Sequence, residues 1–130
     1  MNKAKQREVS YASPFLDPAR WINENEYAAA LRDTYPVSPG HTLIVPKRLV
    51  GSVFDLTPIE VQACWDLLNV ERKRLADEFK PDGFNIGVNI GEAAGQTIRQ
   101  AHFHLIPRYH GDHSAPRGGV RGVIPGKANY

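Results

Sequence analysis

One amphipathic stretch, from Thr57 to just before Pro81, constrains the fold of this chain more than any other feature. Its opening letters, T-P-I-E, supply an N-cap residue, a proline at the first helical position and a capping-box glutamate. Apolar residues then recur mostly at spacings of three, four or seven, as on a helix with one face against a core. These residues are Val61, Cys64, Trp65, Leu68, Leu75 and Phe79. The sequence therefore predicts one long helix that ends before the proline.

Four further segments are typical of β-strands. Residues 26–33 and 41–48 lie before the helix, and residues 83–91 and 100–108 follow it. Residues 13–25 predict a short helical turn that packs its aromatic side chains against the core. Strands and helices do not alternate along the chain, so the pattern favours an α+β fold over a doubly wound parallel sheet.

The chain length of 130 residues is that of one domain. We expect a flexible tail at residues 1–10 and a single domain over residues 11–130. From about residue 111 the sequence is rich in glycine, proline, arginine and histidine, which predicts loops. Residues 120–124 could add a short extended piece.

Charge and cysteine content exclude several classes of protein. Sixteen lysines and arginines against fourteen acidic residues give a net charge of +2, too balanced for general nucleic-acid binding through bulk charge. The single cysteine excludes an internal disulfide framework and a cysteine-rich zinc site. No segment has the length and apolar character of a membrane helix, and the first residues lack the apolar run of a secretory signal. We expect a cytoplasmic protein without membrane contact.

The segment QAHFHLIPR, residues 100–108, carries the clearest chemical signal. On a strand, Gln100, His102 and His104 would form a polar row roughly 13 Å long on one face, while the other face is apolar. A rigid strand suits catalytic imidazoles, because their tautomers and ring orientations must be held fixed. Two solvent-exposed histidines would explain this pattern equally well if it stood alone.

Neighbouring residues strengthen the chemical interpretation. Gly95 offers an open backbone, Gln96 an amide and Thr97 a hydroxyl, a combination that suits an anionic oxygen. His41 follows a Pro-Gly pair and could join the same site, although a plain loop histidine is equally consistent with this position.

A zinc site is an alternative interpretation of the two histidines. His102 and His104 could chelate zinc with His41, His110 or His113 completing the set. No cysteine lies nearby and the segment holds no acidic residue, so we expect no metal and no other cofactor.

Two longer segments resemble the histidine triad family. They are RDTYPVSPGHTLIVPKR and NIGVNIGEAAGQTIRQAHFHLIPR, and the similarity extends over about residues 13–108. The resemblance implies a five-stranded antiparallel sheet with one long and one short helix, often paired into a homodimer. It also implies a small-molecule nucleotide substrate, a nucleotide conjugate or dinucleoside polyphosphate, that is attacked at its α-phosphorus and releases a nucleoside monophosphate.

The resemblance also assigns roles to individual residues. His102 takes the place of the nucleophile, His104 that of a donor to a phosphoryl oxygen or to the leaving group, and His41 that of a fourth histidine in the same network. Asp33 matches the residue that binds the ribose hydroxyls, although it could equally cap a turn. The matches to phosphate-binding positions are Asn89, Gly95, Gln96 and Thr97.

Gln100 departs from the family pattern, which has histidine at this position. An amide donates and accepts hydrogen bonds but carries no titratable proton near neutral pH. A proton relay through this position is therefore absent, whereas an orienting role is retained. We expect an active hydrolase, with a nucleotide-binding or sensing module of little turnover and a zinc-dependent hydrolase as the alternatives. Four arginines could contact phosphates beyond the first: Arg99, Arg108, Arg117 and Arg121.

Overall fold

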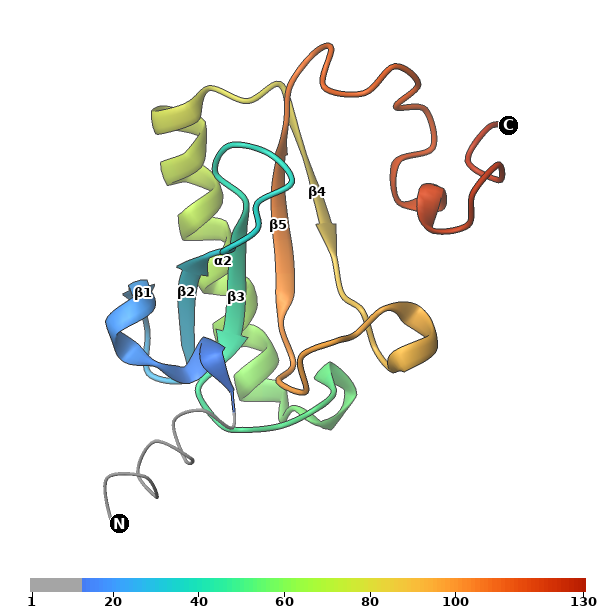
Figure 1. Cartoon of the computed structure of the whole chain (residues 1–130). Helices are drawn as coiled ribbons and strands as arrows, with labels where there is room; N and C mark the ends of the chain where they lie inside the picture. Colours follow the sequence, from blue (N-terminus) through green and yellow to red (C-terminus); the bar gives the residue numbers. More distant parts are fainter. Residues whose placement is uncertain (1–12) are drawn as a thin grey trace.

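The structure is a computed structural model that describes residues 13–130. One antiparallel sheet of five strands, in the order β1-β2-β3-β5-β4, is packed against one long helix (Figure 1). The strands are β1 (Trp21–Glu24), β2 (Ala28–Arg32), β3 (Thr42–Pro46), β4 (Gly83–Gly87) and β5 (Phe103–Arg108), and the helix is α2 (Pro58–Phe79). This arrangement confirms the α+β fold with its five-stranded antiparallel sheet. The tail expected at residues 1–10 lies outside the described residues and stays a prediction.

Helix α2 begins with the predicted capping box. The backbone N–H of Glu60 donates to the Thr57 hydroxyl at 3.3 Å, and the Thr57 N–H donates to the Glu60 carboxylate at 2.8 Å. Lys80 ends the helix in a left-handed conformation with φ of 52°, directly before Pro81. The local sequence signals therefore define both ends of α2. None of the helices within residues 13–130 combines the length and apolar character needed to cross a bilayer.

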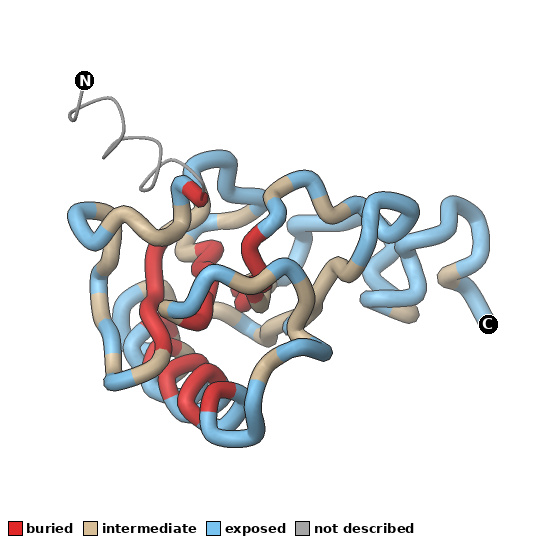
Figure 2. Tube along the Cα trace, turned by 90° about the horizontal axis from the view of Figure 1, so that it is seen from below, coloured by how far each residue is buried: buried red, intermediate tan, exposed pale blue. Residues whose placement is uncertain are grey.

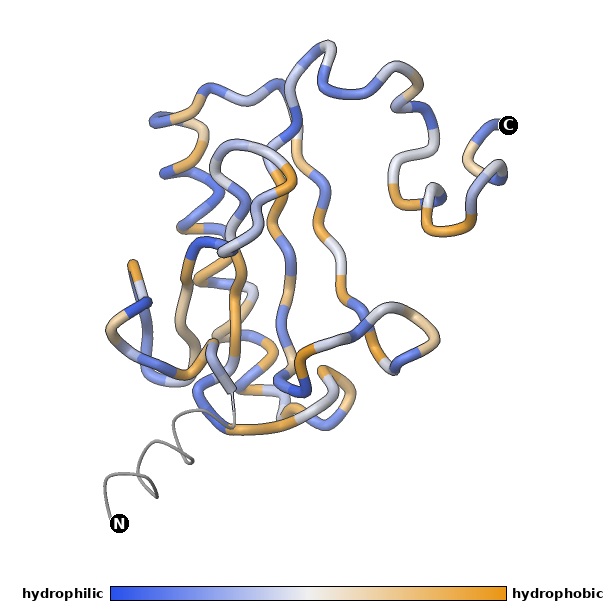
Figure 3. The backbone as a smooth tube through the Cα atoms, viewed as in Figure 1, coloured by the Kyte–Doolittle hydropathy of each residue, from blue (hydrophilic) through white to orange (hydrophobic). Residues whose placement is uncertain are grey.

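The sheet is buried on both faces at its centre. Figure 2 shows buried residues along the central strands, and Figure 3 shows that β3 is hydrophobic. One face packs Ala28, Ala30, Ile44 and Leu105 against α2. The opposite face packs Ala29, Leu31, Leu43 and Val45 against Phe15, Leu16 and Trp21. Burial on two faces explains why β2 contains a run of small and apolar residues and not an alternating pattern.

Residues 13–25 differ from the sequence prediction. They form two 3₁₀ helices, Pro14–Leu16 and Pro18–Arg20, and then strand β1. The predicted short helix is thus a pair of 3₁₀ turns, and the strand was missed. β1 has only four residues, alternates between partly buried and exposed, and is interrupted by an irregularity between Trp21 and Asn23. A strand this short carries too little periodicity for sequence analysis to detect.

The C-terminal segment contains loops, as predicted, and runs out beyond edge strand β4 (Figure 1). The prediction of an extended piece at residues 120–124 is wrong, because Gly119–Val123 forms a 3₁₀ helix. Gly118, which precedes this helix, and Gly119, its first residue, have positive φ values of 91° and 51°, which turn the chain out of an extended path.

Candidate functional site

The β-ladder between β3 and β5 stops where the candidate site begins. Its last pairs are Leu43 with His104 and Ile44 with Phe103. His104 therefore lies on the face of the sheet opposite α2, and His102 precedes the strand. The two rings have centroids 5.0 Å apart and line the same cavity. Gln100 departs from the predicted row, because its side chain is 0% exposed and does not line that cavity.

Hydrogen bonding fixes the tautomer of His102. Its Nδ1 lies 2.7 Å from the carbonyl oxygen of Gln100. A carbonyl oxygen can only accept, so Nδ1 carries the proton and donates it. In the neutral ring the lone pair is then on Nε2. His102 is only 7% exposed, so the surrounding protein holds the ring in place, which is the state required of a nitrogen nucleophile.

A second chain of hydrogen bonds orients His41 and His104. The backbone N–H of Val37 donates to Nδ1 of His41 at 3.1 Å, so the proton of neutral His41 is on Nε2. This Nε2 lies 2.9 Å from Nδ1 of His104, which must accept. The remaining proton of neutral His104 is therefore on its Nε2. The structure thus brings His41, His102 and His104 together.

Both imidazoles in this chain of hydrogen bonds, those of His41 and His104, are held neutral. Burial is the main reason that the pKa of His104 falls to about 4, and the nearby His102 and His41 lower it further. Burial likewise lowers the pKa of His41, against the opposing effect of Asp33. Near pH 7 these two rings act as hydrogen-bond donors and acceptors without carrying charge.

Asp33 belongs to the same cluster. Its Oδ1 accepts from the backbone N–H of Tyr35 at 2.9 Å, which is the turn-capping contact considered above. Its Oδ2 lies 3.4 Å from Nε2 of His41. The side chain also lines the cavity. Asp33 therefore has both a structural contact and a position from which a carboxylate could reach a ligand.

The cavity that contains the two rings has a volume of about 480 Å³. Segments from four parts of the chain line it: Pro14, Phe15, Arg20, Asp33, Thr34, Tyr35, Asn89, Gly95, Gln96, Thr97, Ile98, His102 and His104. Sequence analysis missed Phe15 and Arg20. The ring of Phe15 meets that of His102 edge-on, with centroids 4.9 Å apart. No local motif marks these residues, because only the folding of residues 14–20 over the sheet brings them to the site.

The four predicted phosphate-binding residues all line this cavity. The side chain of Gln96, however, is already hydrogen-bonded within the protein. Gln96 accepts from the N–H of Gly91 at 2.9 Å and donates to the carbonyl oxygens of Gly51 (2.8 Å) and Ile98 (3.1 Å). Its amide thus closes the loop. Gly95 has a φ of 94°, and a Cβ added there would meet open space, so a ligand can approach its backbone closely.

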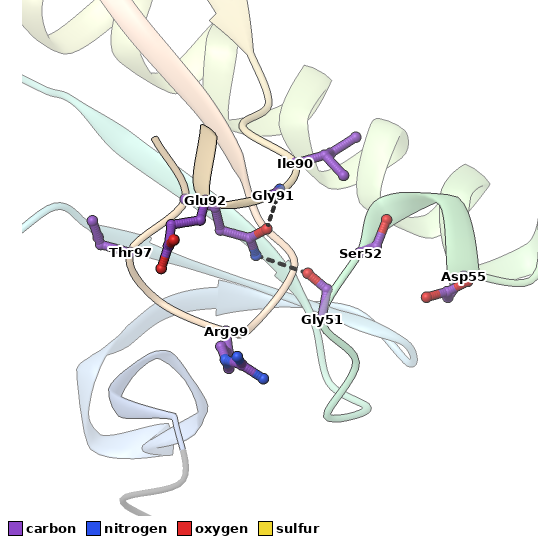
Figure 4. Close-up of a pocket in the computed structure, with 9 residues that line it drawn as sticks. Gly51, Ser52, Asp55, Ile90, Gly91, Glu92, Thr97 and Arg99 are labelled. Atoms are coloured by element: carbon purple, nitrogen blue, oxygen red, sulfur yellow. Dashed lines mark hydrogen bonds between the residues drawn. The ribbon is translucent and has the colours of Figure 1, made fainter. Parts of the chain in front are cut away.

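A neighbouring cavity of about 780 Å³ shares Gln96 and Thr97 with the first one. Figure 4 shows its lining, which includes Ser52, Asp55 and Arg99, and the hydrogen bonds that join the Gln96 side chain to Gly91 and Gly51. Of the four predicted arginines, Arg99 is the one that lines this cavity together with Gln96 and Thr97.

The other three arginines have protein partners. Arg108 binds Asp112 at 2.8 Å and Asn85 at 2.6 Å. Arg117 and Arg121 lie over the ring of Tyr130, at 4.8 and 4.9 Å from its centroid. These three side chains, which the sequence analysis suggested as contacts for phosphates beyond the first, are thus engaged within the protein.

The residues best placed to hold a metal are Asp33, His41 and His104, whose ligand atoms lie within 4.8 Å of one another. His102, His110 and His113 are not in this group. A metal on Nε2 of His41 would need the lone pair of that nitrogen, yet the Val37 N–H already occupies Nδ1 and places the proton on Nε2. The donor set therefore fits a hydrogen-bond relay better than a zinc site.

Comparison with known proteins identifies the fold family. The HIT domain model matches residues 16–111. The chain belongs to the histidine triad (HIT) family. The HIT family protein from Bacillus anthracis has 38% sequence identity and a TM-score of 0.68, over 71% of this chain and 65% of that chain. A zinc-bound histidine triad family protein from Mycobacterium smegmatis has 31% identity and a TM-score of 0.71, over 79% of each chain.

Two curated relatives of this HIT chain differ in what their names state. Protein hit of Bacillus subtilis is 35% identical over 92 residues, which cover 71% of this chain and 63% of that protein. The bis(5'-adenosyl)-triphosphatase of Saccharomyces cerevisiae is 36% identical over 100 residues, 76% of this chain and 48% of that protein. The chain thus spans less than two thirds of the length of either relative.

Proposed function

We propose that this HIT protein hydrolyses small-molecule nucleotide conjugates at the phosphorus next to the nucleoside, through a nucleotidyl-His102 intermediate. The observation that carries this proposal is the 2.7 Å contact between Nδ1 of His102 and the Gln100 carbonyl, which leaves a lone pair on Nε2 beside a cavity of about 480 Å³. A nucleoside monophosphate fits a cavity of this size. Phe15 would face the base or ribose, and Asp33 would accept from the ribose hydroxyls.

Catalysis would proceed in two displacements. The lone pair of His102 Nε2 forms a bond to phosphorus, and the bond from phosphorus to the leaving group breaks with its electron pair. The ring then carries a positive charge, which the Gln100 carbonyl stabilises through Nδ1–H. Water next attacks phosphorus, the N–P bond breaks, and the electron pair returns to Nε2 while the water proton passes to solvent.

His104 and the phosphate loop would stabilise the charge that develops on the phosphoryl oxygens. The hydrogen-bond chain from Val37 through His41 leaves a proton on Nε2 of His104. Asn89, Gly95 and Thr97 line the same cavity and would complete this set of contacts.

The protonation states favour leaving groups that depart as stable anions. Gln100 carries no titratable proton, and the neutral ring of His104 is a poor acid. An amine released from a phosphoramidate must gain a proton, whereas the phosphate chain of a dinucleoside polyphosphate need not. We therefore infer that phosphoanhydrides are the preferred substrates. The similarity to a bis(5'-adenosyl)-triphosphatase supports the same class.

The decisive experiment compares the wild type with His102→Ala on diadenosine triphosphate and on adenosine 5'-phosphoramidate, with monophosphate release followed by chromatography. Loss of the nucleophile should lower kcat by at least about a thousandfold. His110→Ala is the matched control, because His110 is 92% exposed and lines neither of the two cavities beside the phosphate loop.

Equal rates for wild type and His102→Ala would refute the proposed nucleophile. Nucleotide binding without any turnover by the wild type would instead indicate a binding or sensing module. From the family resemblance we also infer a homodimer, in which edge strand β4 offers one surface for a second chain.

A further inference from the structure

The side chain of Gln100 makes three hydrogen bonds to the last residue of β3 and the segment that follows it. Its side-chain Nε2 donates to the carbonyl oxygens of Pro46 at 3.0 Å and Arg48 at 2.9 Å. Its Oε1 accepts from the backbone N–H of Val50 at 3.0 Å. With an exposure of 0%, this amide is a buried clamp on residues 46–50.

The same segment also holds the peptide bond that follows Gln100. The backbone N–H of Ala101 donates to the carbonyl oxygen of Val50 at 2.7 Å. This N–H and the carbonyl of Gln100 belong to one planar peptide unit, so fixing the N–H also fixes the direction of the carbonyl. That carbonyl is the one that accepts from Nδ1 of His102. The clamp is therefore connected to the imidazole through a single rigid plane.

We propose that Gln100 is a positioning residue. By clamping residues 46–50 it aims the carbonyl of its own peptide unit, and so keeps the proton of His102 on Nδ1 and the lone pair on Nε2. The importance for turnover rests on the proposed function, whereas the effect on the ring does not. Without this acceptor, a neutral imidazole can place its proton on either nitrogen, and only one of the two forms has its lone pair on Nε2.

The chemistry of the clamp explains why an amide stands where the family has histidine. Two carbonyl oxygens and one N–H require a side chain with two donors and one acceptor. Neutral imidazole has one donor and one acceptor, and imidazolium has two donors and no acceptor. A carboxylate would bring an acceptor against two carbonyl oxygens. Glutamine matches all three partners, and it does so at any pH.

The first test measures the tautomer of His102 in the wild type. In protein labelled with ¹⁵N-histidine, NMR reports which ring nitrogen carries the proton, and the His102→Asn spectrum identifies the signals of that ring. We expect the neutral form of the His102 ring to carry its proton on Nδ1. A ring with its proton mainly on Nε2 would overturn the proposal, and this result is obtained with Gln100 unchanged.

The second test uses Gln100→Met, which keeps the bulk of the side chain and removes its hydrogen bonds, and Gln100→His. For diadenosine triphosphate we expect kcat to fall about tenfold in both, the effect of losing one ordering hydrogen bond. KM should stay within about twofold, because Gln100 does not line the nucleotide cavity. The matched control is Gln62→Met, at an exposed position on α2.

The readouts separate a positioning role from a general loss of structure. In Gln100→Met the His102 signals should shift toward a mixture of tautomers, while adenosine monophosphate binding stays within about twofold of the wild type. Unchanged kcat and unchanged tautomer in this variant would refute the proposal, and so would a rise in KM at constant kcat. If the wild type turned over no substrate, the proposed function would fail, but the NMR comparison would still decide the role of Gln100.

Discussion

Gly40, directly before His41, offers the sharpest test of how the fold supports the site. Its φ is +89°, a conformation that residues with a side chain rarely adopt. A Cβ built there would lie 2.9 Å from a methyl carbon of Leu75, 3.2 Å from Pro107 and 3.3 Å from the ring of Phe79. An alanine at this position would therefore meet both backbone strain and crowding against α2.

The expected cost follows from these two effects. The positive φ costs roughly 1–2 kcal/mol in a residue with a Cβ, and crowding in a packed core costs about 1–3 kcal/mol. Partial relaxation of Leu75 and Phe79 lowers the sum, so Gly40→Ala should reduce the free energy of unfolding by about 2–4 kcal/mol. Activity should also fall, because the loop that ends at His41 contains the Val37 N–H that sets its tautomer.

The assay is urea denaturation followed by circular dichroism, with m-values compared among the variants. Gly83→Ala is the matched control, because Gly83 has an ordinary φ and a Cβ there would meet nothing within 4 Å. We expect this control to change stability by less than about 1 kcal/mol. If the free energies of unfolding of Gly40→Ala and Gly83→Ala differ by less than about 0.5 kcal/mol, neither the positive φ nor the packing at Gly40 limits stability.

Two further predictions concern pH and the ribose. The pKa of His104 is about 4 in the folded protein against 6.5 for an ordinary histidine, so the unfolded chain binds a proton first as the pH falls below 6.5. This contribution to the free energy of unfolding is complete above pH 6.5 and is lost as the pH falls toward 4. Its size is on the order of 2 kcal/mol after allowance for the partial exposure of His104. Identical urea midpoints at pH 7 and pH 5 would contradict this prediction. Asp33→Asn should raise KM about tenfold for a ribonucleotide substrate, because a charged acceptor for the ribose diol is lost. The KM for the 2',3'-dideoxy analogue should rise much less. Equal effects on the two substrates in steady-state kinetics would exclude the ribose contact.

Local signals in the sequence predicted much of the fold. Helix α2 was predicted at both ends, because its capping box and the proline after it act within a few residues of each terminus. Strands β2, β3, β4 and β5 each lie within a predicted segment. β1 was missed because its partly exposed residues, such as Ile22, depend on pairing with β2 for their conformation. The 3₁₀ helix at Gly119–Val123 was missed because a Val-Arg-Gly-Val pattern resembles an extended strand until the positive φ values of Gly118 and Gly119 are known.

Parts of the candidate site could be predicted only where the local sequence contains polar or titratable side chains in a recognisable pattern. His102, His104 and His41 could be named, as could the loop that contains Gly95 and Thr97, because their chemistry and the family resemblance agree. Phe15 lies almost 90 residues away from His102 and His104 in sequence and reaches the site only because its segment packs over the sheet. Its apolar side chain predicts burial, and burial alone does not indicate what it faces.

The end of the β3–β5 ladder is what allows the site to form. Had β5 continued its pairing to residue 100, the backbone of Gln100 would be engaged in sheet hydrogen bonds, and alternation would place its side chain in the row with the histidines. Pro46 has no N–H to extend the ladder, and residues 46–50 instead bind Gln100 and Ala101 through a side-chain amide and one peptide N–H. The carbonyl of Gln100 is thereby left to accept from His102. The alternating pattern thus pointed to His102 and His104, whereas the departure from that alternation at Gln100 is what orients His102.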